Sequence, residues 1–206
     1  MLIFEGAIAG FGTSSGTRLV VGMWPRSPLG AVADVMVEGP DGHRTLLAPS
    51  TEVADFVAAT YRFDEISVVP VTYRRSGPMW WVQAGALSVR FTTGGRGALG
   101  WLLRGVPRPL ARARWWAAVL DPIAARLMPG VRTRGTAGGG RREWYAALDL
   151  HSIATIEAFW NDDDLGSLHD VHPPVRFGFG STPVRPSLVR VATSIDLGSS
   201  GSPGHH

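Results

Sequence analysis

One stretch of this chain, residues 99 to 128, has a sustained helical pattern, and the sequence on both sides of it is patterned as strands. Pro109 suits the first turn of a helix, and apolar residues follow it at steps of three and four. Asp121 and Pro122 restart the pattern as cap and first helical residue, so a kink or a second short helix is expected up to Met128. The chain is therefore expected to carry its main helical region between two β-rich halves.

The first half consists of short Val-rich runs separated by turns that contain Gly, Pro and Asp. Strands are predicted at residues 2–9, 17–24, 31–38, 43–47 and 65–73, and one or two more over residues 80–91. A short helix is predicted over residues 49–61, with Ser50 or Thr51 as its cap. Because side chains alternate across a strand, one of Trp80 and Trp81 should face the interior and the other the far side of the sheet.

The second half adds strands predicted at residues 143–150, 153–159, 175–179 and 188–197, with a helix as the alternative for 153–159. Runs of strands rather than alternating strands and helices favour an α+β, mainly β fold. We expect a curved antiparallel sheet or barrel-like meander with two or three helices, the main one at about 99–128. Residues 1–197 are predicted to form a single domain, and residues 198–206 a flexible Gly/Ser/His tail.

The chain contains no cysteine and no lysine, and all 20 of its basic residues are arginine. The absence of cysteine excludes disulfides, thiolate nucleophiles and iron–sulfur clusters. The absence of lysine excludes Schiff-base chemistry and the lysine of a phosphate-binding P-loop. No apolar run approaches the roughly 18 residues of a membrane span. We expect a cytoplasmic protein without a cofactor.

The basic character of the sequence is local. The pI is about 10.1, but the net charge is only +3. An arginine in place of a lysine raises the pI and adds no charge. The composition therefore does not favour nucleic acid as a partner. Between Arg90 and Arg142 the sequence has eleven arginines and one acidic residue, Asp121. A site for an anion is therefore most expected in this region.

Two groups of residues in this region are candidate ligand-binding residues. The first flanks the glycine-rich loop at residues 131–140, where glycine amides and guanidinium groups can hold a carboxylate or a phosphate. It consists of Arg132, Arg134, Arg141 and Arg142. The second consists of Trp101, Trp115, Trp116 and Trp144, since the chain has more tryptophan than its core requires. A solvated loop and extra core packing are the alternatives to these interpretations.

Other motifs are weaker. The glycines at 10, 12 and 16 resemble a dinucleotide-binding turn, but a strand follows them, which favours a hairpin. His169 and His172 lie close to several aspartates in sequence, yet their spacing specifies no metal geometry, and no metal site is predicted. His151 and Asp149 are two residues apart on a predicted strand, so they share a face and could act as a base and its orienting acid.

These observations leave three functions open. The favoured one is a non-catalytic binding module for a small amphipathic or anionic ligand. The first alternative is an enzyme that acts on a small anionic substrate, with His151, His169 or His172 as acid or base and arginines in a positioning role. The second is a peripheral membrane or protein-interaction role for the Trp/Arg region, in which Arg108, Arg112 and Arg114 would face anionic lipid. A homodimer is compatible with all three.

Overall fold

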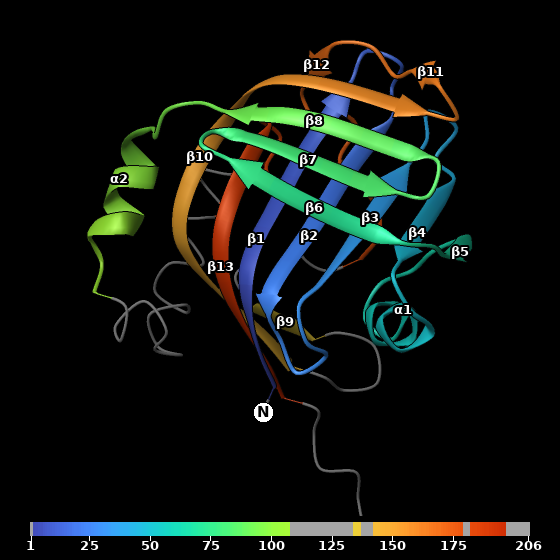
Figure 1. Cartoon of the computed structure of the whole chain (residues 1–206). Coiled ribbons are helices and arrows are strands. Elements are labelled where there is room, and N and C mark those ends of the chain that lie inside the picture. The colour runs from blue at the N-terminus through green and yellow to red at the C-terminus, as the bar shows by residue number, and fades with distance from the viewer. Residues whose placement is uncertain (1, 108–133, 137–141, 179–181, 197–206) are drawn as a thin grey trace, which may run out of the picture.

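The computed structural model describes residues 2–107, 134–136, 142–178 and 182–196, with side chains at all of these positions except 134–136, 142–145, 195 and 196 (Figure 1). Within these residues the chain forms thirteen strands and two helices. In chain order they are β1 Leu2–Thr13, β2 Arg18–Arg26, β3 Val32–Glu38, β4 Arg44–Ala48, α1 Thr51–Ala58, β5 Glu65–Val68, β6 Val71–Ser76, β7 Met79–Ala84, β8 Leu87–Thr93, α2 Ala98–Gly105, β9 Arg134–Thr136, β10 Arg142–Trp160, β11 Asp163–Asp164, β12 Leu168–His169 and β13 Ser187–Asp196.

The strands form one sheet in the order β5-β4-β3-β2-β1-β13-β10-β8-β7-β6, with β9 and β11 paired to β10 and β12 paired to β1. Neighbouring strands along this path are antiparallel except β4 and β5, which run parallel. That pair is parallel because α1 carries the chain back between the two strands as a crossover. The expected curved, mainly β architecture with few helices is confirmed. The parallel pair of β4 and β5 was not part of the expected antiparallel sheet.

Strand β10 makes the sheet curl. Its first part, up to Ser152, pairs with β13, and its second part, from Ile153, pairs with β8. Its register with β13 shifts between Ala147 and Asp149, and its register with β8 shifts between Ile153 and Thr155. Such bulges bend a strand and increase its twist. As a result β6, β7 and β8 cross over β1, β2 and β3, and the sheet forms a half-barrel (Figure 1).

The main apolar core lies between these two layers of the half-barrel. Phe91 packs against Phe11 and against Trp80, with ring centroids 6.0 and 5.9 Å apart. Trp80 is 7% exposed, whereas Trp81 lies on the outward face of the same strand. The prediction that the two adjacent tryptophans face opposite sides is confirmed.

The outer face of β1 to β4 is covered by α1 and by residues 170–178. Helix α1 begins after Ser50, whose Oγ accepts a hydrogen bond from the backbone N–H of Val53 at 3.3 Å. Its residues Val53 and Ala54 form an apolar cluster with Leu46 and Ala48 of β4. A third cluster is built from Val171, Val175 and Phe177. The sheet therefore has apolar contacts on both faces in this half.

A buried ion cluster ties residues 170–178 to the sheet. Glu38 is fully buried, and its carboxylate lies 3.0 Å from Arg18 Nη2. The same carboxylate accepts hydrogen bonds from Arg176 Nε at 2.9 Å and from the Arg176 backbone N–H at 2.7 Å. Arg18 also donates to the carbonyls of Gly16 and Gly39. The two buried charges, on Glu38 and Arg18, thus compensate each other, and the exposed Arg176 adds further bonds to the carboxylate.

Asp34 is a second buried carboxyl on this outer face, and it is 4% exposed. Its Oδ1 accepts a hydrogen bond from Trp24 Nε1 at 3.1 Å. Burial raises the pKa of Asp34 to about 6, although the Trp24 hydrogen bond acts in the opposite direction. Ionisation of this group therefore falls close to neutral pH.

Four predicted strands have different boundaries in the structure. The strand predicted over residues 65–73 is divided into β5 and β6 near Pro70, which has no N–H for a ladder. The strands predicted at 143–150 and 153–159 are one continuous strand, β10. The strand predicted at 175–179 is irregular over residues 175–178, because backbone groups there bond to Arg62 and Glu38 instead of a neighbouring strand.

The helical stretch predicted at 99–128 is described only in its first part. Helix α2 ends at Gly105, two residues before Pro107, and residues 108–133 lie outside the description. Gly100 lets α2 approach β10 closely, because a Cβ there would lie 2.3 Å from the Leu150 carbonyl oxygen.

The glycines at 10 and 12 lie in the β1–β2 hairpin, as expected. Neither described helix is long and apolar enough to cross a membrane.

Candidate functional site

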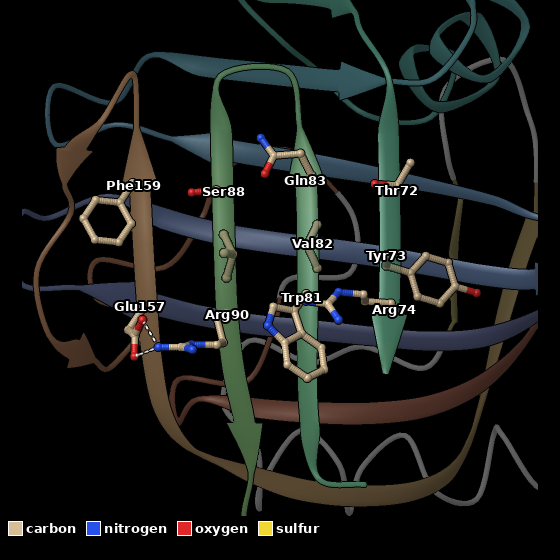
Figure 2. Close-up of a pocket in the computed structure, with 11 residues that line it drawn as sticks. Thr72, Tyr73, Arg74, Trp81, Val82, Gln83, Ser88, Arg90, Glu157 and Phe159 are labelled. Atoms are coloured by element: carbon tan, nitrogen blue, oxygen red, sulfur yellow. Dashed lines mark hydrogen bonds and ion pairs between the residues drawn. The ribbon is translucent and has the colours of Figure 1, made fainter. Parts of the chain in front are cut away.

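A groove of about 560 Å³ lies on the outward face of β6, β7, β8 and β10 (Figure 2). It is lined by Thr72, Tyr73, Arg74, Trp81, Val82, Gln83, Ser88, Val89, Arg90, Glu157 and Phe159. Two tight hairpins position the first three strands, and the second one turns at Gly85, which has a φ of +57°. Alternation then directs one set of side chains into the core and the other into the groove.

Four side chains form a row across the middle of the groove. Arg74 is paired with Trp81, Trp81 with Arg90, and Arg90 with Glu157, each on the neighbouring strand. Figure 2 shows these side chains side by side on one face of the sheet. Since neighbouring strands lie about 4.8 Å apart, the row spans roughly 15 Å. That length suits a small molecule lying across the strands.

The row places an aromatic ring between two cationic groups. The Arg74 guanidinium carbon lies 4.0 Å from the Trp81 ring centroid, a cation–π contact. Arg90 Nη2 hydrogen-bonds to both carboxylate oxygens of Glu157. The side chains of Arg90 and Glu157 are 46% and 56% exposed, so water reaches this pair. Arg74 forms no ion pair with any described carboxylate, which leaves the row with an excess of one positive charge.

A second row lies beside the first and carries uncharged groups. Thr72, Gln83, Ser88 and Phe159 occupy successive strands there (Figure 2). The Gln83 side-chain amide is committed to the carbonyl of Gly85, to which it donates at 2.9 Å. The groove therefore combines a positively charged row with a row of hydroxyl groups and an aromatic ring. It can bind an anion and a flat apolar surface at the same time.

Of the predicted ligand-binding residues, Trp101 is the one whose side chain is described, and it lies outside this groove. Arg132, Arg141, Trp115 and Trp116 lie outside the described residues, as do Arg108, Arg112 and Arg114. The backbones of Arg134, Arg142 and Trp144 belong to the β9–β10 ladder, in which Trp144 lies opposite Arg134. Their side chains are outside the description. Trp101 is 61% exposed on α2, where its ring lies 5.2 Å from the Arg96 guanidinium carbon.

The candidate histidines are not brought together by the fold. His151 Nε2 lies 3.6 Å from Asp149 Oδ2, and its Nδ1 lies 3.1 Å from the carbonyl oxygen of Gly94. His169 and His172 are exposed and lie on the other side of the sheet, where His169 is paired with Gly12 at the end of β1. Among the described residues, no group of three or more histidine or carboxylate side chains is arranged to hold a metal ion.

Sequence reasoning missed the groove residues, although one local signal was present. The alternation in residues 87–91 places Ser88 and Arg90 on the face opposite the core. The alternation does not reveal that Arg74 and Glu157 lie in the same row. Comparison with protein-family models, curated proteins and solved structures gave no match for this chain. The function must therefore be inferred from the site itself.

Proposed function

We propose that this protein is a non-catalytic binding module that holds a small anionic ligand with a flat apolar part in the groove of β6, β7, β8 and β10. The observation that supports this proposal is the row in which Trp81 lies between Arg74 and Arg90. The ligand's apolar part lies along Trp81, and its anionic group contacts the two guanidinium groups. A cytoplasmic location, expected from the sequence, belongs to the same proposal.

The ion pair between Arg90 and Glu157 does not prevent this binding. Both side chains are about half exposed, and exposed pairs of this kind contribute roughly 0–1 kcal/mol. A ligand anion can therefore displace Glu157 from Arg90 at a small cost. Arg74 needs no such displacement, because it is not ion-paired with a described residue. Arg74 is thus the first contact for the anion, and Arg90 the second.

The proposal is tested with two dyes that differ only in charge. Anilinonaphthalene sulfonate carries an anionic group on an aromatic body, and N-phenylnaphthylamine lacks the sulfonate. We expect the sulfonate dye to bind more tightly in a fluorescence titration, and we expect Arg74→Gln to remove most of that difference. Equal binding of the two dyes, unaffected by Arg74→Gln, would overturn the proposal.

Replacing Trp81 with alanine should weaken binding of the sulfonate dye about tenfold, because an aromatic contact contributes roughly 0.5–1.5 kcal/mol beyond its buried area. The matched control is Trp101→Ala, since Trp101 is also exposed but lies on α2, away from the groove. Fluorescence titration of both variants compares them directly. A loss of binding in Trp101→Ala alone would place the dye at α2 and contradict the assignment of the groove.

Replacing Glu157 with glutamine should strengthen binding of the sulfonate dye about threefold, because Arg90 then loses a competing carboxylate. The control is Glu65→Gln, which removes an exposed carboxylate that lies 3.4 Å from His43 Nε2 and outside the groove. The dissociation constant should stay unchanged in that control. Weaker binding in Glu157→Gln would mean that Glu157 contacts the ligand rather than competing with it.

A further inference from the structure

A second polar cluster, separate from the groove, lies where α2 meets β10. Its centre is Asp149, which follows the bulge in β10 and has a side chain that is 3% exposed. Arg96 binds this carboxylate through two hydrogen bonds, from Nε to Oδ1 at 2.8 Å and from Nη2 to Oδ2 at 2.9 Å. The backbone N–H of Leu150 also donates to Oδ1, at 3.0 Å. Asp149 is therefore well satisfied by Arg96 and the backbone alone.

Two more side chains approach the same carboxylate without reaching hydrogen-bonding distance. Arg104 Nη1 of α2 lies 3.9 Å from Asp149 Oδ2, and His151 Nε2 lies 3.6 Å from it. Neither of these atoms has a hydrogen bond to any other described residue. The His151 Nδ1–H donates to the Gly94 carbonyl oxygen at 3.1 Å, so Nε2 of the neutral ring is an acceptor. Arg104 is therefore the residue here that brings N–H donors without a close acceptor.

Arg190 of β13 faces the same region. It lies directly opposite Asp149 in the β10–β13 ladder, and paired residues project from the same face of a sheet. This is the concave face, because Leu188, two residues earlier on β13, belongs to the main core. The Arg190 side chain is exposed and forms no ion pair with a described carboxylate. A second unmatched donor group therefore stands next to Asp149.

The charges in this cluster do not balance. Arg96, Arg104 and Arg190 bring three positive charges, and Asp149 is the one carboxylate among them in the part of the chain that the structure describes. Burial raises the pKa of Asp149, but the hydrogen bonds and positive charge of Arg96 lower it by more. The net pKa lies below the ordinary value, so the group is ionised at neutral pH. Two positive charges are left over, and the side chain of Arg104 is 53% exposed to solvent. A dianion has the charge that matches this excess.

We propose that Arg104 and Arg190 form a binding site for a phosphate group on the concave face of the sheet, beside α2. Guanidinium groups bind phosphate oxygens through paired N–H donors. Asp149 and Arg96 hold the site in shape rather than contacting the phosphate. This site lies on the face of the sheet opposite to the groove, and it does not depend on the groove's proposed function.

The test uses the whole protein and inorganic phosphate as the probe, in a buffer free of other multivalent anions. Calorimetry measures the dissociation constant, and NMR of the arginine Nε–H groups identifies which side chains respond. We expect Arg104→Gln and Arg190→Gln each to weaken phosphate binding about tenfold, as expected for loss of one charge-assisted contact. Both replaced side chains are solvent-exposed and leave the Arg96–Asp149 pair intact, so the variants should fold.

Two controls keep the outcome specific. Arg185→Gln removes an exposed arginine outside the cluster and should leave phosphate binding unchanged. Arg90→Gln removes a groove arginine and should leave it unchanged as well. If wild-type protein binds no phosphate at millimolar concentration, or if Arg104→Gln and Arg190→Gln bind it like the wild type, the phosphate site is excluded. A phosphate response confined to Arg74 and Arg90 would assign the anion to the groove and overturn this inference while supporting the proposed function.

Discussion

Replacing Glu38 with alanine is expected to lower the free energy of unfolding by about 3–5 kcal/mol, which is the largest effect we expect from a single substitution. Glu38 is fully buried, and the Arg18 side chain that it neutralises is 4% exposed. Without Glu38, the Arg18 charge stays in the protein interior with only two carbonyl oxygens as partners. Urea denaturation at pH 7 followed by circular dichroism measures the loss.

Arg176→Ala is the matched comparison for Glu38→Ala. The Arg176 side chain is 67% exposed, and it contacts the same carboxylate through Nε. Its backbone N–H remains bonded to Glu38 after the substitution, so a loss of only about 1 kcal/mol is expected. Equal losses in the two variants would show that the Arg18 charge is not the source of the instability, and would contradict the prediction.

Asp34→Asn is expected to raise the free energy of unfolding at pH 8 by about 2 kcal/mol and to leave it nearly unchanged at pH 4. The pKa of Asp34 is about 6 in the folded protein and 3.8 in an unfolded chain. The folded state therefore holds its proton more tightly, so ionisation of Asp34 lowers stability as the pH rises from about 4 to 6. Above that range the ionised carboxylate costs the wild type roughly 3 kcal/mol, which corresponds to a shift of about two pKa units. Asparagine avoids this cost, but burial of its amide offsets part of the gain, which leaves the expected increase of about 2 kcal/mol.

Urea denaturation of wild type and Asp34→Asn across pH 4 to 8 tests this sign. The difference in the free energy of unfolding between the two proteins isolates the contribution of Asp34. Carboxyl groups with a lowered pKa, such as Asp64 with its hydrogen bonds to Arg44, contribute equally to both proteins and cancel. Trp24→Phe serves as a second probe, because it removes the hydrogen bond that lowers the Asp34 pKa and should move the pH dependence upward. Parallel stability profiles for wild type and Asp34→Asn would contradict the prediction.

Local features of the fold were predictable because they depend on short patterns. Gly and Pro turns separated the first four strands correctly, and Ser50 marked the start of α1. That Trp80 and Trp81 face opposite sides of the sheet followed from alternation alone. Boundaries were wrong where a distant partner decides them: β10 runs unbroken through residues 151 and 152 because β13 and β8 pair with its two parts in succession. The sequence does not show which strands those partners are.

The candidate groove was not predictable for the same reason. Its central row needs the register of three strand pairs, and Arg90 and Glu157 are 67 residues apart in the chain. The sequence instead drew attention to Arg and Trp residues in the most basic region, most of which lie outside the described residues or have undescribed side chains. High local density of a residue type indicates composition, whereas a site depends on which side chains share a face.

The position of β13 has a consequence for how this protein acquires its structure. Strand β13 lies between β1 and β10, so the central ladder pairs residues from opposite ends of the described chain, such as Ile3 with Ser194. The hairpins of residues 2–48 and 71–93 can form from neighbouring segments, but β13 joins them into one sheet only when its ladder with β1 closes a loop of well over a hundred residues. Folding rates fall as contacts become more distant in sequence. Assembly of the half-barrel should therefore be slow compared with formation of its hairpins, and a chain that lacks residues 187–196 should hold two separate hairpin units without the joined core.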